Sequence, residues 1–332
     1  MGLKFFDFFA GIGGFRLGME QAGHECVGHC EIDKYANMSY NAMHKPKESE
    51  VYFDDIRTVG TEDMPEADVY CFGFPCQSFS IAGKRRGFND IRGTLFFEVM
   101  RLAAVRKPKI LFAENVAGLL SHDHGRTFAI IINTMAELGY FVEWQIINSK
   151  YYVPQNRKRV FIIGRFRESC GGQIFPIITG RGKVDRQQRH GDILKEITKG
   201  KPQGQRVYDP SGLSVTLGSQ GGGQGAKTGL YAVKPGLTPG RENKRQNGRR
   251  FKEDGEESFA LNTQDRHGVL LDNGEEIRIR KLTPKECFRL QGFPDEYFER
   301  AAAVCSENQL YKQAGNSVTV NVIYEIAKRL KV

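Results

Sequence analysis

The 332-residue sequence lacks a hydrophobic run long enough to cross a bilayer, which argues against a membrane-spanning helix. A secretory leader is not expected either, because Asp7 interrupts the apolar N-terminal run and no cleavage pattern follows it. Phe6 stands where an N-myristoylation signal has Ser or Thr. The seven cysteines include no C-x-x-C pair and are odd in number, which is typical of a reducing compartment. These absences predict a cytoplasmic protein that does not contact membranes.

Acidic residues are fewer than basic ones. The chain has 39 Asp and Glu against 48 Lys and Arg, which gives a formal net charge of +9. Such an excess favours a polyanionic partner, with nucleic acid as the first candidate. Hydrophobic residues make up 40% of the chain, and its length exceeds what one small core needs. We therefore expect one large domain and a second, smaller one.

Strand and helix patterns alternate up to residue 167, which predicts an α/β domain with a doubly wound, mostly parallel sheet. We expect strands at 3–9, 25–31, 68–72, 110–113, 141–148 and 160–166, and helices at 15–22, 34–42, 93–105 and 127–138. From 168 to 280 glycine and charge increase and helical periodicity vanishes, which predicts a smaller, mainly β or irregular domain with strand-like stretches at 213–217 and 268–271. Residues 281–332 return to a helical pattern, and 317–330 should pack back on the first domain.

One thiol, that of Cys76, stands at the start of a polar, glycine-bounded loop directly after the apolar stretch 68–72. Pro75 cannot continue a strand, so we expect Cys76 at the carboxyl edge of the sheet, where open α/β sheets bind ligands. An isolated cysteine more often packs as a small hydrophobe in a core. The flanking Gly73 and Gln77 instead favour a nucleophile at this position.

The segment 7–15, Asp-Phe-Phe-Ala-Gly-Ile-Gly-Gly-Phe, predicts a strand, a glycine turn and a helix start. Arg16 occupies the place of the third glycine in the dinucleotide fingerprint, which argues against a pyrophosphate and so against a nicotinamide oxidoreductase. Glu31 ends the second expected strand, where an acid can bind ribose hydroxyls. A nucleoside-bearing cofactor without a pyrophosphate fits both facts, and an ordinary glycine turn remains the alternative for this segment alone.

Polar side chains mark two further strand ends. Glu114 ends the stretch that starts at 110, in a position parallel to that of Cys76, where a carboxyl group could donate a proton or cap a helix. Arg157 and Arg159 alternate before the last expected strand of the domain and should face one side. They could clamp an anion or a carbonyl group, or belong to a solvated basic turn.

The segment 24–30 has the residue types of a metal site. Strand alternation should place His24, Cys26 and Cys30 on one face of the sheet and His29 on the other. Because the four side chains would then not converge, we expect no bound metal.

Together these motifs occur in the order found in DNA (cytosine-5) methyltransferases of the bacterial restriction-modification type, and the sequence resembles that family over essentially its whole length. The matching segments are 9–15, Gly-Phe-Pro-Cys-Gln-Ser-Phe-Ser from 73, Arg-Gly-Thr-Leu-Phe from 92, Glu-Asn-Val from 114, 155–159, 282–294 and Gln-Ala-Gly-Asn-Ser-Val from 313. The Pro-Cys and Glu-Asn-Val motifs are highly specific when they occur together. The resemblance implies a Rossmann-like catalytic domain at 1–167 that depends on S-adenosyl-L-methionine, and a target-recognition domain at 168–280.

The resemblance implies transfer of a methyl group to carbon 5 of a cytosine flipped out of duplex DNA, through a covalent adduct. Cys76 would add to carbon 6, Glu114 would activate the base, and Arg159 would hold its carbonyl oxygen with Arg157 in support. The implied cofactor contacts are Phe9, Gly11, Gly13, Glu31, Ile32, Asp55, Ile56, Pro75, Leu95, Asn316 and Ser317. At Ile32 the sequence departs from well-known members, which carry an aromatic residue that stacks on adenine.

The polar stretch 77–92 resembles the active-site loop that closes over DNA, with contacts implied for Gln77, Ser80, Lys84 and Arg92. Residues 203–223 resemble the recognition loops of GCGC-methylating members. There Gln203 would fill the space left by the flipped base and Arg206 would read guanine, and the nearby contacts would be Thr216, Gly222 and Gly223. The stretch 235–267 is an apparent insertion, so the recognised sequence can differ.

The expected partner is therefore double-stranded DNA, bound by a monomer. A cognate restriction endonuclease would act on the same site without direct contact. A tRNA cytosine-5 methyltransferase and a non-catalytic DNA-binding module are the alternatives, and the intact set of Cys76, Glu114 and Arg159 argues against the second.

Overall fold

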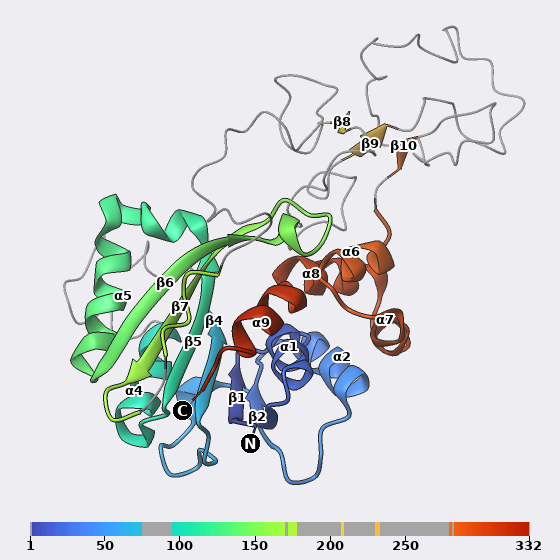
Figure 1. Cartoon of the computed structure of the whole chain (residues 1–332). Helices are drawn as coiled ribbons and strands as arrows, with labels where there is room; N and C mark the ends of the chain where they lie inside the picture. Colours follow the sequence, from blue (N-terminus) through green and yellow to red (C-terminus); the bar gives the residue numbers. More distant parts are fainter. Residues whose placement is uncertain are drawn as a thin grey trace, which may run out of the picture.

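A seven-stranded sheet forms the centre of the protein (Figure 1). The computed structural model describes residues 2–74, 95–169, 172–177, 207–208, 230–232, 279–280 and 282–331. In these residues the strands of the large sheet are β1 (Lys4–Phe8), β2 (Glu25–Cys30), β3 (Val51–Phe53), β4 (Val69–Gly73), β5 (Ile110–Val116), β6 (Tyr140–Asn148) and β7 (Lys158–Phe166). Their order is β3-β2-β1-β4-β5-β7-β6, and neighbours run parallel except that β7 is antiparallel to β5 and β6. The predicted doubly wound, mostly parallel sheet is confirmed.

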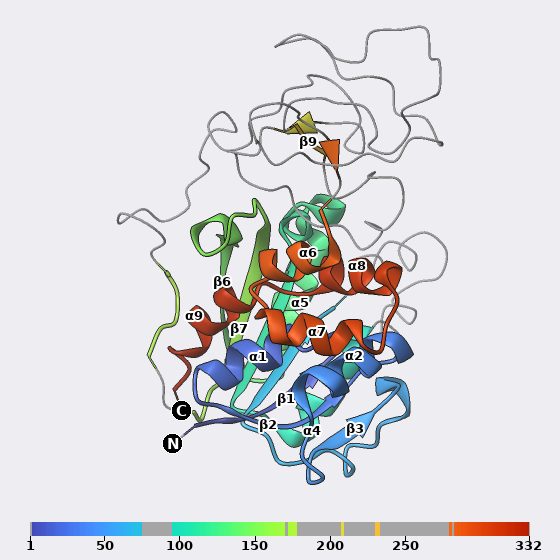
Figure 2. The same ribbon diagram turned by 90° about the vertical axis from the view of Figure 1, so that its right-hand side faces the viewer.

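Helices cover both faces of this sheet. The described ones are α1 (Gly14–Gln21), α2 (Lys34–His44), α4 (Leu95–Arg106), α5 (Arg126–Glu137), α6 (Pro284–Leu290), α7 (Asp295–Ala302), α8 (Glu307–Asn316) and α9 (Val320–Ala327). Helices α4 and α5 pack on one face, and α1 and α9 pack on the other (Figures 1 and 2). In these residues no helix is long and apolar enough to cross a membrane.

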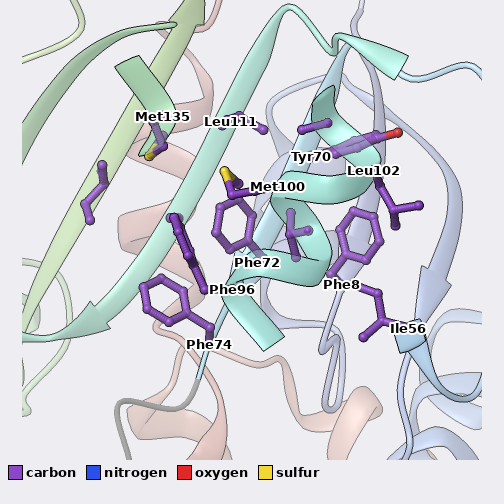
Figure 3. Close-up of a cluster of buried hydrophobic side chains, with 14 of the residues drawn as sticks. Phe8, Ile56, Tyr70, Phe72, Phe74, Phe96, Met100, Leu102, Leu111 and Met135 are labelled. Carbon is purple, nitrogen blue, oxygen red and sulfur yellow. The ribbon is translucent and has the colours of Figure 1, made fainter. Parts of the chain in front are cut away.

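Alternation along β1 divides the core into two layers. Phe6 and Phe8 point to the face that carries α4, where they join Phe72 and Phe96 (Figure 3), whereas Phe5 points to the face of α1 and α9. Burial of each such ring contributes about 1.5–3 kcal/mol to folding. The central strands β1, β4 and β5 are almost wholly buried, and on β5 the polar Glu114 and Asn115 follow the apolar residues near the carboxyl end.

The segment 282–331 packs against the N-terminal part of the chain. Helix α6 begins with a capping box in which Thr283 and Glu286 satisfy each other's backbone N–H groups, and α9 crosses α1. At the crossing, a Cβ on Gly18 would lie 2.6 Å from the Cβ of Ile323, so the helices touch through backbone. The C-terminal helix α9 thus lies against α1.

Several expected elements differ in extent. β5 continues through Val116 and so includes Glu114, and the edge strand β3 was not expected from the sequence. The expected helix 93–105 is seen from Leu95 onward. Three short strands, β8 (Val207–Tyr208), β9 (Leu230–Ala232) and β10 (Ile279–Arg280), form a second sheet, whereas 213–217 and 268–271 lie outside the described residues. The boundaries at 167 and 280 stay predictions.

The expectation that Cys26 and Cys30 share a face of the sheet is wrong. Cys26 packs in the layer of α1 and α9, whereas Cys30 packs in the layer of α4. The cause is a β-bulge, because Phe5 pairs with Cys26 but Phe6 pairs with Gly28, and the extra residue reverses the alternation. His29 consequently lies on the same side as Cys26, and both contact Tyr40.

Candidate active site

A cavity of about 400 Å³ opens at the carboxyl ends of β1 and β4, where the strand order reverses. Such a switch point is where open α/β sheets bind ligands. Residues from both ends of the chain line it: Phe9, Ala10, Gly11, Gly14, Phe15, Glu31, Asp33, Ala36, Gly73, Phe74, Glu114, Asn115, Val116, Arg157, Arg159, Lys312, Gln313, Gly315, Asn316, Ser317 and Val318.

The glycine turn between β1 and α1 forms one wall. Gly11 has a φ of +57°, and a Cβ there would meet nothing within 4 Å, so the backbone is open to a ligand on that side. Its N–H donates to Oε2 of Glu31 at 2.7 Å, and the N–H of Asp33 donates to Oε1 at 2.7 Å. Burial raises the pKa of Glu31, and these two backbone donors oppose the increase. The carboxylate is thereby fixed in the cavity with lone pairs left for hydroxyl groups.

The opposite wall holds an ion pair between two strand ends. Arg159 Nε lies 2.9 Å from Oε1 of Glu114, and both side chains are mostly buried. The sheet register brings them close, because Glu114 of β5 pairs with Phe161 of β7, and Arg159 lies two residues from Phe161 on the same strand. The pair places a carboxyl group and a guanidinium side by side, as recognition of a polar planar molecule requires.

Arg157 joins this wall to the C-terminal segment. Its Nη2 donates to the carbonyl oxygens of Ser317 at 2.9 Å and Gly315 at 3.3 Å, and the residue is 3% exposed. Burial, with a smaller contribution from the charge of Arg159, lowers the pKa of Arg157 to about 9, so the guanidinium stays charged at neutral pH. The predicted placement of both arginines on one side agrees with this geometry.

Asn115 is a candidate functional residue that we did not predict from the sequence. Its Nδ2 donates to the carbonyl oxygen of Phe74 at 2.7 Å, and its Oδ1 accepts from the N–H of Val116. The chain is thus held two residues before Cys76. Lys312 was also missed; it pairs with Asp33 at 2.6 Å across the rim of the cavity. No local pattern marks either contact, because each joins segments far apart in sequence.

Of the site residues expected from the sequence, eight line the cavity: Phe9, Gly11, Glu31, Glu114, Arg157, Arg159, Asn316 and Ser317. Five described ones lie elsewhere. Gly13 lies against His44, Ile32 is 66% exposed, and Ile56 and Leu95 pack in the core layer of α4. Asp55 caps the short helix Ile56–Thr58 and pairs with Arg57.

The other expected site residues lie outside the described part of the chain: Pro75, Cys76, Gln77, Ser80, Lys84, Arg92, Gln203, Arg206, Thr216, Gly222 and Gly223. Within the described part of the chain, no three His, Cys, Asp or Glu side chains are grouped so as to hold a metal ion.

The chain is similar to known proteins over nearly its whole length. The chain is 36% identical over 358 residues to the type II methyltransferase M.HhaI of Haemophilus parahaemolyticus, covering 98% of this chain and 93% of that protein. It is 35% identical over 428 residues to the orphan methyltransferase M.SPRI of Bacillus phage SPR, covering 99% and 97%.

Solved structures share the fold at lower identity. A Spodoptera frugiperda DNMT2 mutant superposes with a TM-score of 0.65 at 20% identity, covering 98% of both chains. The Entamoeba histolytica methyltransferase EhMeth gives a TM-score of 0.64 at 19% identity, covering 98% of this chain and 96% of that one. The family model for C-5 cytosine-specific DNA methylases matches residues 3–332. This chain therefore belongs to the C-5 cytosine-specific DNA methylase family.

Proposed function

We propose that the protein transfers a methyl group from S-adenosyl-L-methionine to carbon 5 of a cytosine flipped out of duplex DNA. One observation carries this proposal. A single cavity at the switch point of the sheet joins the fixed carboxylate of Glu31 to the Glu114–Arg159 pair. One wall suits a nucleoside cofactor and the other suits a pyrimidine. M.HhaI and the phage relatives are named as methyltransferases, and membership of the DNA methylase family supports a DNA substrate.

The described residues fit the adenosyl and methionine parts of the cofactor. Glu31 offers acceptors for ribose hydroxyls, and the open side of Gly11 admits close backbone approach. Asn316 and Ser317 close the cavity from the C-terminal segment. When bound, S-adenosyl-L-methionine supplies an electrophilic methyl group. The chain's own task is to hold the base at the right distance and to exclude water.

The cytosine would be activated from two sides. Carbon 5 is a poor nucleophile until a thiolate adds to carbon 6, and we assign that addition to Cys76. Glu114 would hydrogen-bond ring nitrogen 3 and the exocyclic amine, while Arg159 would hold the carbonyl oxygen. Once carbon 5 carried the methyl group, a base would take its proton, and the electron pair of that C–H bond would expel the Cys76 thiolate.

Base flipping leaves a gap in the duplex, and unstacking costs a few kcal/mol. We assign Gln203 to that gap and Arg206 to a guanine of the recognised sequence, because bidentate contact from arginine to guanine is the commonest specific base contact. The loop 77–92 would contact the phosphates.

The test is transfer of labelled methyl groups from S-adenosyl-L-methionine to duplex DNA, to RNA and to no acceptor. We expect label on DNA alone. Bisulfite sequencing of the methylated DNA then reads out the recognised site. Transfer to RNA and not to DNA would favour the tRNA-modifying alternative, and binding of DNA without any transfer would favour a non-catalytic module.

Two cysteine variants test whether Cys76 is the nucleophile. Cys76→Ser should abolish transfer, with a loss of at least about 10³-fold, and retain cofactor binding in isothermal titration calorimetry. Cys305→Ser is the matched control, because Cys305 is a free, half-buried thiol that does not line the cavity. Loss of cofactor binding in Cys76→Ser would show instead that this position is structural.

A further inference from the structure

A histidine lies directly behind the glycine turn, outside the cavity. His44, the last residue of α2, has its Nε2 3.0 Å from the carbonyl oxygen of Ile12, at the centre of the turn. A carbonyl oxygen can only accept, so Nε2 carries the proton and donates. Burial is the main cause that lowers the pKa of His44 to about 3, which leaves a neutral ring with one N–H at neutral pH.

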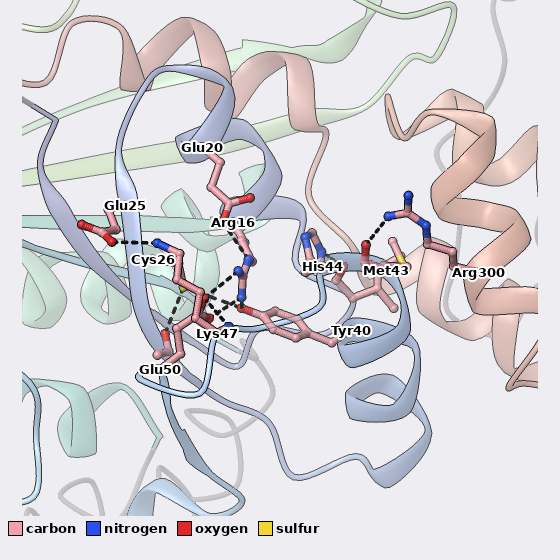
Figure 4. A network of polar contacts seen from close by, with 12 residues as sticks. Arg16, Glu20, Glu25, Cys26, Tyr40, Met43, His44, Lys47, Glu50 and Arg300 are labelled. Carbon is pink, nitrogen blue, oxygen red and sulfur yellow. Dashed lines mark hydrogen bonds and ion pairs between the residues drawn. The ribbon is translucent and has the colours of Figure 1, made fainter.

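Aromatic rings and an ion cluster fix the histidine in place. Its ring lies 4.8 Å from that of Tyr40 and 5.3 Å, edge to face, from that of Tyr297 on α7. Tyr40 accepts a hydrogen bond from Arg16, which is itself held by two bonds to Glu50 (Figure 4). The donor therefore has little freedom to move away from the turn.

Arg300 of α7 strengthens this arrangement, because its Nη1 donates to the carbonyl oxygen of Met43 at 2.8 Å (Figure 4). Gly13 completes it from the side of the turn. A Cβ at Gly13 would lie 2.2 Å from Nε2 of His44, and its φ is +77°. Gly13 is therefore needed so that the ring can reach the turn, although Gly13 does not line the cavity.

We infer that His44 is a positioning residue for the methyl donor, which it serves by holding the Ile12 carbonyl and so the conformation of the glycine turn. The inference rests on the proposed function. Gly11 and Gly13 flank Ile12 and can each adopt many backbone conformations, so without an anchor the turn would have to be ordered by the ligand. The peptide group of Gly11 that meets Glu31 would then lose its fixed direction.

The test compares two variants of the full chain that differ in the donor. His44→Gln keeps an amide N–H that can reach the Ile12 carbonyl, and His44→Leu removes the donor at similar volume. Calorimetric titration with S-adenosyl-L-methionine should give a Kd about tenfold weaker for His44→Leu and within about threefold of wild type for His44→Gln. The KM for the cofactor should change in parallel, while kcat at saturating cofactor stays within about twofold.

Wild-type affinity in His44→Leu, or equal weakening in both variants, would overturn the inference, because the donor would then not matter. A fall in kcat without a change in KM would overturn it as well. If His44→Leu does not fold, His44→Met replaces it in the same comparison. A wild-type chain that does not bind S-adenosyl-L-methionine at all would overturn the proposed function, and that outcome is separate from any difference between the variants.

Discussion

Arg157 is a cation buried among carbonyl oxygens, and one of its nitrogens, Nη2, donates to two of them. One guanidinium reaches the carbonyls of both Gly315 and Ser317, which lie on either side of Asn316 in the cavity wall. The two N–H groups of Nη2 have fixed directions in the guanidinium plane, whereas the three N–H groups of a lysine ammonium rotate at the end of a flexible stem. Arg157 therefore sets the path of the C-terminal wall rather than supplying charge alone.

Arg157→Lys should consequently weaken the cofactor site although the charge is kept. We expect a Kd for S-adenosyl-L-methionine about tenfold higher, and a free energy of unfolding about 2 kcal/mol lower because buried carbonyls lose a donor. Calorimetry and urea unfolding measure the two quantities. Arg126→Lys is the control, since Arg126 is exposed on α5 and pairs with Asp123. Equal behaviour of the two variants would contradict the role given to Arg157.

Residues at strand ends could be predicted from the sequence, whereas residues that hold them could not. Glu31, Glu114 and Arg159 follow or begin apolar strands, and the rule for parallel sheets brings such positions to one edge. Asn115 and His44 each contact a backbone carbonyl group. Because every residue has such a carbonyl, the sequence does not show which one is contacted. Such contacts become visible only when distant segments are placed in space.

At the scale of elements, the crossing of α1 and α9 decides whether the C-terminal wall reaches the cavity. Gly18 lets the two helices touch, and Val320 and Ile323 of α9 lie against it. The glycine costs about 1 kcal/mol of helix propensity relative to alanine, which the close packing offsets. Ser317, just before α9, is in turn next to Gly14 of the turn.

Gly18→Ala tests this crossing. The added methyl group would meet Ile323 at 2.6 Å, so we expect a loss of about 1–3 kcal/mol in unfolding free energy despite the better helix propensity. Gly118→Ala is the control, because a Cβ there meets nothing within 4 Å. In the double variant with Ile323→Gly, which removes the Cβ that the new methyl group would meet, the loss from Gly18→Ala should shrink, and a purely additive double-mutant cycle would refute direct contact.

Helices and strands could be predicted where the hydrophobic periodicity runs over many residues. The prediction failed where the periodic stretch is short. β3 has three residues, too few to show alternation, and it forms because the edge of β2 is free to pair. The bulge in β2 was invisible for a similar reason, since one extra residue in a six-residue strand changes which face each side chain meets without changing composition.

For the whole molecule, the net charge of +9 bears on DNA binding rather than on the fold. If about six phosphates are neutralised, the binding constant for duplex DNA should fall about 10³-fold between 50 and 200 mM salt. Fluorescence anisotropy measures this slope. Affinity for S-adenosyl-L-methionine should change far less over the same range of salt concentration. A DNA affinity that does not depend on salt concentration would contradict an electrostatic interface.

The same measurement tests whether one residue of the loop 77–92, Lys84, contacts a phosphate. Lys84→Gln should reduce the slope of log K against log salt by about one, as loss of one phosphate contact predicts. Lys328→Gln should leave the slope unchanged, because Lys328 pairs with Glu325 on α9.

The cavity has one wall from the first 40 residues of the chain and another from residues 312–318. Residues 312–318 must therefore be synthesised before the two walls can meet. A chain that stops before residue 312 contains the glycine turn and Glu31 but has no Asn316 beside them, and α9 does not yet cover α1. Chains truncated before residue 312 should accordingly show no methyltransferase activity.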